Sequence, residues 1–278
     1  MYKRQIPGSS SILVETEGKR ILFTGDIKFI STELMNGACT DFDVDVIISE
    51  STYSYKNHPD RESLRDRIRE IAQYTLYNNG ILLLPCFAVG RTQEMLLILH
   101  DLGFPTYLDG MGIEATSRIL NHPDSIKNPD KLRKAFSRAG KIRRQQDRLR
   151  AIKNPCIIIT TAGMLNGGPI GYYMKKLHNR EDCSLVLTGF QVPGTVGRTL
   201  LDTGKYIAEG LDIKPKMRVE FLDFSAHTDH DHLLEFYKKI NPGKIFLVHG
   251  ERTEEFAKEL KETGFDAYAP KNGERVRI

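Results

Sequence analysis

Three apolar runs in the sequence each end on a residue that can bind a metal ion or transfer a proton. The run beginning at Ile21 ends on Asp26, and those beginning at Phe221 and Phe246 end on His227 and His249. A buried strand that ends in a polar side chain holds that side chain rigidly at the rim of a sheet. A strand followed by a polar turn explains any one run equally well. The three together predict a metal site assembled from distant segments.

The residue types at these positions suit metal-assisted hydrolysis. Asp26 follows Gly25, where a carboxylate can direct both oxygens into a cleft and bridge two divalent ions; a turn-capping role is the alternative. Imidazole is a common zinc ligand and a proton donor near neutral pH, which fits His227 and His249. Three acidic residues are candidates for orienting the imidazole rings: Glu50, Asp229 and Glu251.

The segment from His227 to His232 almost reproduces the zinc-binding pattern H-x-H-x-D-H, with Asp229 in place of the second histidine. If it were that pattern, further ligands would have to follow it, and the remaining sequence holds one more histidine and no Gly-Asp pair. We therefore interpret His230 and His232 as the first turn of a helix.

Two glycine-containing loops and one basic segment have the chemistry of phosphate binding. The loop from Pro85 leads from a strand into a helix, and the loop 163–169 offers backbone N–H groups without side-chain bulk. Between Lys131 and Lys153 there are ten lysines and arginines against one acid, Asp147, which predicts either a polyanion-binding helix face or a solvated one. The candidate phosphate-binding residues are Gly90, Arg91, Gly163, Gly167, Gly168, Ser225, Arg143 and Arg144.

The composition is that of a globular protein. The 278 residues are 40% hydrophobic and 27% charged, with a net charge of +4, too small by itself to indicate a polyanion partner. No apolar stretch approaches the roughly 18 residues of a membrane span, and no signal-peptide pattern follows Met1. The scattered cysteines suit buried thiols in a reducing compartment, so we expect a cytoplasmic protein without membrane contact.

The middle of the chain alternates strand-like and helix-like segments, as a parallel α/β sheet requires. We predict one basic helix over 131–152 and a strand over 216–221. Polar or Gly/Pro-containing links near 54–60 and 210–215 predict boundaries there. The expected organisation is an α/β unit, 55–215, inserted between flanking segments 1–54 and 216–278 that form one domain.

Taken in order, the motifs resemble those of the β-CASP branch of the metallo-β-lactamase superfamily. They are Leu22-Phe-Thr-Gly-Asp26, Glu50-Ser-Thr-Tyr53, Pro85-x-Phe-Ala-x-Gly-Arg-x-Gln-Glu94, Gly163-Met-Leu-x-Gly-Gly-Pro169, Phe224-Ser-Ala-His-Thr-Asp229 and Leu247-Val-His-Gly-Glu251. Within that branch the chain is most similar to the archaeal and eukaryotic endonuclease subunit of the cleavage and polyadenylation machinery, with RNase J more distant.

The resemblance implies a ribonuclease that uses two zinc ions per complete site. It implies that Asp26 bridges the zincs, that Glu50 pairs with His227, and that His227 donates a proton to the leaving oxygen. His249 would ligate the second zinc. The implied fold is the C-terminal portion of a metallo-β-lactamase αββα domain, carrying an inserted β-CASP α/β domain with a parallel sheet that clamps RNA.

The sequence departs from the family pattern at the first zinc. It contains no H-x-H-x-D-H run, and Gln5 stands where the family has a histidine before Ile6-Pro-Gly-Ser9. Three explanations are open: a fragment of a longer protein, one half of a split enzyme completed by an N-terminal polypeptide, or a metal-deficient RNA-binding relative. Absent strands would leave a sheet edge and an apolar face exposed, so we expect a complementing partner or a homodimer.

Overall fold

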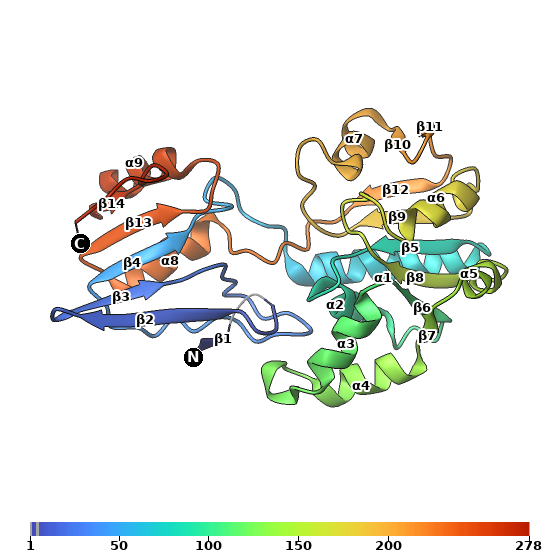
Figure 1. Ribbon diagram of the computed structural model, residues 1–278, viewed down its shortest axis with the longest axis horizontal. Coiled ribbons are helices and arrows are strands. Elements are labelled where there is room, and N and C mark those ends of the chain that lie inside the picture. The colour runs from blue at the N-terminus through green and yellow to red at the C-terminus, as the bar shows by residue number, and fades with distance from the viewer. Residues whose placement is uncertain (1, 4–5, 278) are drawn as a thin grey trace. The chain divides into compact units, whose positions relative to one another are not determined.

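The computed structural model describes residues 2–3 and 6–277 and divides the chain into two compact units (Figure 1). Both ends of the chain, Met1–His58 and Ala226–Ile278, form what we call the split unit, and Pro59–Ser225 forms the inserted unit. The first boundary falls within the predicted link 54–60. Gln5, at the position where the resemblance expects a histidine, lies outside the described residues.

The split unit is built on a mixed sheet with the strand order β1-β2-β3-β4-β13-β14. Its strands are β1 (Tyr2–Lys3), β2 (Ser10–Thr16), β3 (Lys19–Phe23), β4 (Val46–Glu50), β13 (Lys244–Val248) and β14 (Ala267–Tyr268). Because β3, β4 and β13 pair in parallel, their carboxyl ends lie at the same edge of the sheet. Two of the three predicted ligand-bearing segments, those ending on Asp26 and His249, leave β3 and β13 at that edge, and Glu50 ends β4 there. The third, which ends on His227, does not continue a strand of this sheet.

Helices α8 (His230–Ile240) and α9 (Thr253–Glu262) cover one face of this sheet. Their apolar residues pack with alternate residues of the strands, as expected when one face of a pleated sheet is buried. The N-terminus of α8 is capped by Asp229, whose carboxylate accepts a hydrogen bond from the backbone N–H of His232. The core of this face includes Leu22, Ile47, Ile245, Leu247, Leu233, Phe236, Tyr237, Phe256 and Leu260.

The opposite face of the same sheet is apolar and partly open to solvent. Ile12 lies across from Phe23 in the β2–β3 ladder, and the two side chains are 60% and 38% exposed. Among the described residues, the apolar cluster on this side consists of strand residues alone: Ile21, Val46 and Phe246, with Ile48 and Tyr268 against them. We refer to this surface as the open sheet face.

The inserted unit contains a parallel sheet with the order β12-β9-β5-β8-β6-β7. Its strands are β5 (Ile81–Pro85), β6 (Thr106–Asp109), β7 (Gly140–Ile142), β8 (Cys156–Thr160), β9 (Ser184–Leu187) and β12 (Arg218–Phe221). Every residue of β5 and β8 is buried, as in a sheet covered by helices on both faces. A hairpin of β10 (Tyr206–Ala208) and β11 (Leu211–Ile213) lies outside this sheet.

Helices α6 and α7 pack on one face of the parallel sheet, whereas α1 and α2 contact the strands β5 and β8. The helices of this unit are α1 (Arg61–Tyr77), α2 (Arg91–Leu99), α3 (Gly112–Leu120), α4 (Pro129–Arg138), α5 (Gln145–Ala151), α6 (Ile170–Leu177) and α7 (Val196–Thr203), with a 3₁₀ turn at Pro123–Ser125. In the part of the chain that the structure describes, none of the helices has the length and apolar character needed to cross a membrane.

The second boundary differs from the predicted one near 210–215. Strand β12 was expected in the split unit, but it pairs in parallel with β9 of the inserted unit, and the boundary falls at Ser225. The sequence of a short strand does not indicate which sheet the strand joins, because its pairing depends on tertiary contacts with residues distant in the chain.

The basic segment also differs from the prediction of one helix over 131–152. It forms α4, the strand β7 and α5, because Gly140 begins a strand that pairs with β6. A Cβ at Gly140 would lie 2.4 Å from the Tyr107 ring, so this close approach of strands requires glycine. The basic residues are therefore spread over three elements rather than aligned on one helix face.

The helix-covered face of the split unit predicts a large difference between two adjacent leucines of α8. Leu233 is fully buried and Leu234 is only half-buried. We expect Leu233→Ala to lower the free energy of unfolding by about 2–5 kcal/mol, because it removes buried methyl groups and leaves a cavity. The matched Leu234→Ala variant should cost less than half as much in urea unfolding. Equal losses would contradict this packing.

Candidate metal and proton-transfer site

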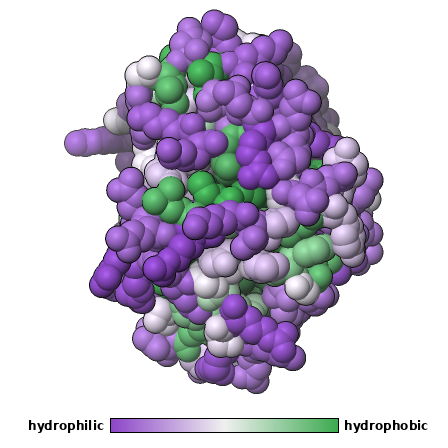
Figure 2. Space-filling view, turned by 90° about the vertical axis from the view of Figure 1, so that its right-hand side faces the viewer, coloured by the Kyte–Doolittle hydropathy of each residue, from purple (hydrophilic) through white to green (hydrophobic). Residues whose placement is uncertain are grey.

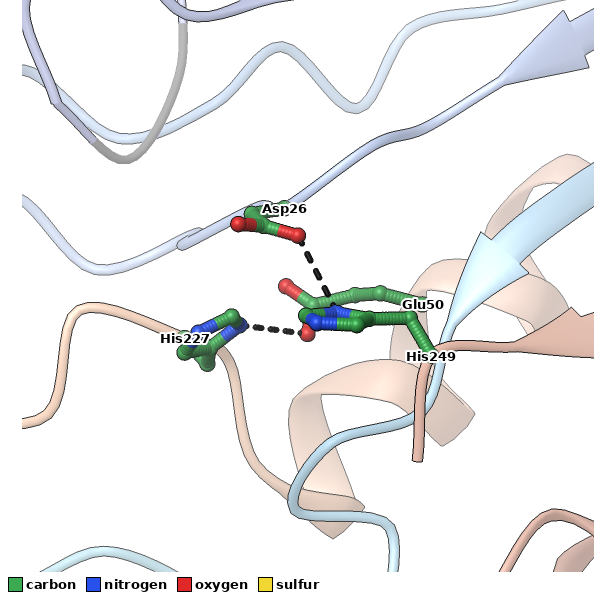
Figure 3. A group of neighbouring side chains, drawn as sticks. All are labelled: Asp26, Glu50, His227 and His249. Carbon is green, nitrogen blue, oxygen red and sulfur yellow. Dashed lines mark hydrogen bonds and ion pairs between the residues drawn. The ribbon is translucent and has the colours of Figure 1, made fainter. Parts of the chain in front are cut away.

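Four side chains from separate segments of the split unit converge at the carboxyl edge of its sheet (Figure 3). Each of Asp26, Glu50, His227 and His249 offers one oxygen or nitrogen, and these atoms all lie within 4.8 Å of one another. Asp26 follows β3, Glu50 ends β4 and His249 follows β13, whereas His227 lies on the chain entering α8. The four sequence positions singled out for catalysis and metal binding are thus neighbours in space.

Glu50 and His227 form the buried half of this cluster. The His227 Nδ1 lies 2.6 Å from Glu50 Oε2, and the Glu50 side chain is 1% exposed. The other carboxylate oxygen, Oε1, accepts a hydrogen bond of 2.6 Å from the backbone N–H of Ile27. Since a buried carboxylate needs such partners, Glu50 is fixed in one position and fixes the imidazole ring with it.

The environment raises the pKa of His227 above its ordinary value. Burial acts to lower that pKa, but the hydrogen bond and the negative charge of Glu50, with a further contribution from Asp26, outweigh burial. The protonated imidazole is therefore favoured, which suits a group that donates a proton.

Asp26 and His249 form the exposed half. Asp26 Oδ1 lies 3.2 Å from His249 Nδ1, with the side chains 42% and 60% exposed. His249 has a left-handed backbone conformation, φ +50°, which is uncommon outside glycine. A Cβ on the following Gly250 would lie 2.5 Å from the carbonyl oxygen of Ser51, so only glycine allows β13 to turn this closely past β4.

The chemistry of these donors fits zinc in part. One carboxylate and one imidazole facing each other are zinc ligands by type, and both are reachable from solvent. In contrast, the two oxygens of Glu50 and the Nδ1 atom of His227 already take part in hydrogen bonds, which join Glu50 to Ile27 and to His227. A catalytic zinc usually has three protein ligands. Among the described residues of this cluster, Asp26 and His249 are thus the natural metal donors, and a full site needs further ones.

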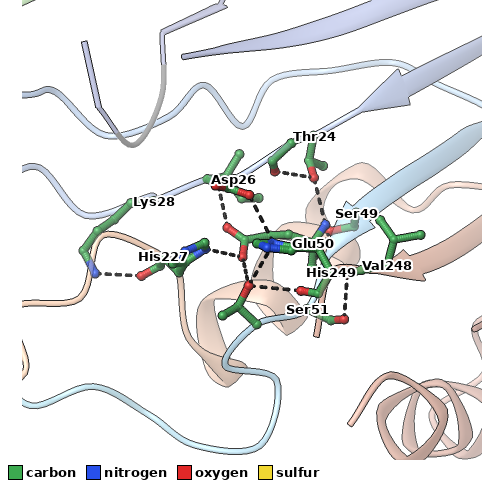
Figure 4. Close-up of polar contacts among 12 residues, drawn as sticks. Thr24, Asp26, Lys28, Ser49, Glu50, Ser51, His227, Val248 and His249 are labelled. Atoms are coloured by element: carbon green, nitrogen blue, oxygen red, sulfur yellow. Dashed lines mark hydrogen bonds and ion pairs between the residues drawn. The ribbon is translucent and has the colours of Figure 1, made fainter. Parts of the chain in front are cut away.

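Sequence reasoning assigned no role to Thr52, yet this side chain joins the two halves of the cluster. Figure 4 shows the polar contacts around Glu50, His227 and His249. The Thr52 hydroxyl donates to Glu50 Oε2 at 2.6 Å and lies 3.0 Å from the His249 carbonyl oxygen. Lys28 was also missed: its buried ammonium group donates to the His227 carbonyl oxygen at 3.1 Å. Thr52 could have been found as a member of the Glu50–Tyr53 motif, whereas Lys28 had no signal in the sequence.

Of the other proposed orienting acids, one caps a helix and the other is exposed. Asp229 caps α8, accepting from the backbone N–H groups of His232 and His58, and Glu251 is exposed. His230 and His232 lie in the first turn of α8, as predicted. Glu50 is the orienting acid that the structure places beside His227.

Gly90 and Arg91, expected to bind phosphate, have a structural role instead. The Arg91 guanidinium is buried and donates to Glu94 at 2.5 Å and to the carbonyl oxygen of Phe224. The backbone N–H of Gly90 donates to Gln93 Oε1 at 2.7 Å, within the same buried turn. The sequence could not reveal this, since Glu94 neutralises the arginine only once α2 is enclosed.

The glycines of the loop 163–169 differ in environment: one is closely packed and two are exposed. A Cβ on Gly163 would lie 3.1 Å from the backbone nitrogen of Phe87, so this glycine serves close packing. Gly167 and Gly168 are exposed and have positive φ. The loop also caps α7, because Asn166 Oδ1 accepts from the backbone N–H of Val196 at 2.8 Å.

The remaining phosphate candidates differ in exposure. Ser225 is 5% exposed, at the end of the inserted unit. Arg143 and Arg144 are exposed in the link between β7 and α5, and their backbone N–H groups donate to Asp147 at 3.3 Å and 3.0 Å. Among the described residues their guanidinium groups have no ion-pair partner, so these two arginines are available to an anionic ligand.

Two family models match the chain. Residues 92–200 match the Beta-Casp domain, and residues 212–270 match the Zn-dependent metallo-hydrolase RNA specificity domain.

Curated relatives match nearly the whole chain. It is 42% identical over 287 residues to a probable RNase, MJ4, of Methanocaldococcus jannaschii, covering 98% of this chain and 67% of that protein. It is 37% identical over 282 residues to RNase aCSPSF2 of Saccharolobus solfataricus, covering 98% and 57%. A transcription termination factor, FttA, of Methanosarcina mazei is 33% identical over 263 residues, covering 83% and 41%. The chain thus spans between two fifths and two thirds of these relatives.

A solved structure shares the fold. The crystal structure of a protein of unknown function from Enterococcus faecalis V583 superposes with a TM-score of 0.58 at 14% identity, covering 99% of this chain and 62% of the other.

The titration of His230 should make the stability of the split unit depend on pH. Burial lowers the pKa of His230, but hydrogen bonds to Asp231 and Glu259, at 2.8 Å and 2.7 Å, outweigh it and leave the pKa raised. The contribution of His230 to the free energy of unfolding is therefore complete below its pKa in the unfolded chain, about 6.5. It is lost as the pH rises through the higher pKa that His230 has in the folded protein.

We expect His230→Gln to lower the free energy of unfolding more at about pH 5.5 than at about pH 8.5. Denaturant unfolding at both values measures the difference. Glu259→Gln, which removes one of the two acceptors, should show the same trend with smaller size. A loss from His230→Gln that grew with pH would contradict the assigned partners.

Proposed function

The chain belongs to the β-CASP family of the metallo-β-lactamase superfamily, and from this membership we propose that it carries part of the active site of a zinc-dependent ribonuclease that hydrolyses phosphodiester bonds. The observation that carries the proposal is the convergence of Asp26, Glu50, His227 and His249 from four segments at one edge of the split-unit sheet. RNase names among the relatives support RNA as the substrate. RNA 3′-end processing or decay in the cytoplasm is the process class we propose.

In this proposal the buried pair moves a proton. Glu50 holds His227 by Nδ1, so the proton for the leaving oxygen is carried on Nε2. The raised pKa of His227 favours the protonated imidazole that such a proton donor requires. Asp26 and His249 would hold zinc, two ions in a complete site; the bound metal would supply a more acidic water and stabilise negative charge on the phosphorus-bound oxygens.

Asp26 and His249 are too few donors for a complete catalytic site, so we propose that further ligands come from another segment or polypeptide. The relatives, which extend beyond the matched region, support this. The open sheet face gives such a polypeptide an apolar surface on the sheet that positions Asp26 and His249. A homodimer through the same face is the alternative occupant.

A second candidate function is an RNA-binding subunit without cleavage. The observation that favours it is the pairing of an incomplete donor set with Arg143 and Arg144, exposed and without ion-pair partners among the described residues. The two candidates differ in whether supplying the missing ligands restores hydrolysis.

The proposed ribonuclease activity can be tested by measuring RNA cleavage after the chain has been combined with a polypeptide that supplies the missing zinc ligands; we call this combination the complemented complex. We expect the chain, mixed with a family polypeptide that carries an H-x-H-x-D-H run and supplied with zinc, to cleave single-stranded RNA. His227→Ala should then lower the rate by about 10²–10⁴-fold, the usual contribution of a general acid. Asp26→Asn and His249→Ala should in addition reduce the zinc bound per complex, measured by elemental analysis after dialysis.

His232→Ala is the matched control for that experiment. His232 lies five positions further on, is hydrogen-bonded to Asp229 rather than to Glu50, and should leave cleavage unchanged. A complemented complex that binds zinc and RNA but does not cleave, or one that cleaves equally well with His227→Ala, would exclude the enzyme as described.

The salt dependence of RNA binding tests the anion-binding arginines. Each phosphate contact on single-stranded RNA should contribute roughly 0.7 to the slope of log affinity against log salt. We therefore expect the double variant Arg143→Ala/Arg144→Ala to make this negative slope less steep by about 1.4. Arg118→Ala, which removes an exposed arginine already paired with Glu114, is the control and should leave the slope unchanged. An unchanged slope in the double variant would remove these arginines from the interface.

A further inference from the structure

The inserted unit contains a surface pocket that the proposed reaction does not use. Its volume is about 460 Å³, within the usual range for small-molecule sites. Figure 2 views the molecule from the side on which Figure 1 shows α5 and α6; hydrophilic residues predominate on this face, with several small apolar areas between them. The residues lining the pocket are Arg148, Gly168, Pro169, Tyr172, Lys175 and Glu209.

Four parts of the inserted unit meet at this pocket. Arg148 comes from α5, Gly168 from the loop before α6, and Glu209 from the turn between β10 and β11. Tyr172 and Lys175 are three residues apart on α6, so they lie on the same side of the helix. The Glu209 carboxylate rests against α6: a Cβ at Gly171 would lie 2.5 Å from its Oε1. The lining is thus held by packed elements rather than by a free loop.

Arg148 gives the pocket a rigid wall. Its guanidinium makes two hydrogen bonds to the buried carboxylate of Asp109, at 2.6 Å and 3.0 Å, and the Tyr173 hydroxyl donates to the same carboxylate at 2.7 Å. The hydrogen bond to Asp109 raises the pKa of Arg148. The guanidinium carbon lies 5.8 Å from the centre of the Tyr172 ring, so a cation and an aromatic ring line the pocket together.

The remaining polar groups of the pocket lack partners. Lys175 and Glu209 are exposed, and neither forms an ion pair among the described residues. The Tyr172 hydroxyl is shielded from solvent and has no hydrogen-bond partner there. The positive charges of Arg148 and Lys175 are matched in number by the negative charges of Asp109 and Glu209, so the pocket has little net charge. It therefore suits a ligand with both an anionic group and hydrogen-bond donors, rather than a run of phosphates.

A nucleotide has this combination of groups. An aromatic base can stack on Tyr172 and Arg148, its phosphate can pair with Lys175, and Glu209 can accept N–H groups from its edge. Guanine alone among the four bases presents two adjacent donors, N1–H and N2–H, that match the two oxygens of a carboxylate. Adenine and cytosine place an acceptor beside their amino group, which a carboxylate repels.

We propose that this pocket binds one guanine nucleotide of a single-stranded RNA, with the base edge on Glu209 and the phosphate on Lys175. The proposal rests on RNA as the ligand of the proposed function. It concerns binding in the inserted unit, however, and its test needs neither zinc nor cleavage.

The first experiment measures GMP, AMP, CMP and UMP binding to the intact chain in the presence of a chelator, by isothermal titration. We expect GMP to bind at least 10-fold more tightly than AMP, since a bidentate contact to a base edge discriminates against the other bases. Glu209→Gln should reduce that preference to 3-fold or less. Lys175→Ala should weaken all four nucleotides alike. Lys176→Ala, the neighbouring exposed lysine outside the pocket lining, is the matched control and should change nothing.

The second experiment separates RNA from a free nucleotide. A short single-stranded RNA with one guanosine should bind more tightly than the same RNA with inosine there, because inosine lacks the N2 amino group. Glu209→Gln should abolish the difference. Binding of GMP with no such difference in RNA would overturn the RNA subsite, and equal binding of all nucleotides, or none, would overturn the pocket assignment. Loss of cleavage with the guanine preference intact would defeat only the proposed enzyme.

Discussion

The burial of the Glu50 carboxylate is the constraint on which the rest of the site depends. A charged group that is 1% exposed is tolerated only when its oxygens have partners, and Glu50 finds them on Ile27, Thr52 and His227. The His227 partner is 177 positions away, at the point where the chain returns from the inserted unit. The carboxylate at the end of β4 therefore lacks one of its partners until the segment that follows the insertion is in place. Folding the split unit and bringing His227 to Glu50 are thus the same event.

The part of the site predicted from the sequence follows from one property of parallel sheets. Because β3, β4 and β13 run in the same direction and in register, apolar runs that end on polar residues deliver those residues to the same edge. Asp26, Glu50 and His249 were recognisable for this reason, without knowledge of distances. The same reasoning anticipated the alternation of strands and helices in the inserted unit, since it depends on local pattern.

The parts that the sequence did not reveal depend on partners distant in the chain. Arg91 has the sequence context of an anion-binding residue, and only the enclosure of α2 turns it into the buried partner of Glu94. The basic segment divides because Gly140 approaches Tyr107, and β12 joins the inserted unit because β9 offers it an edge. In each case the local residues permit two outcomes and tertiary packing selects one.

The two halves of the cluster also differ in how firmly they are held, and this difference matches their proposed roles. The Glu50–His227 pair is shielded from water, so its geometry is set by the protein before any ligand arrives. The Asp26–His249 contact is largely exposed, and such surface pairs contribute little to stability. A cation can therefore replace that contact at small cost, whereas replacing Glu50–His227 would leave a buried carboxylate without its partner. The arrangement favours metal at the exposed pair and proton transfer at the buried one.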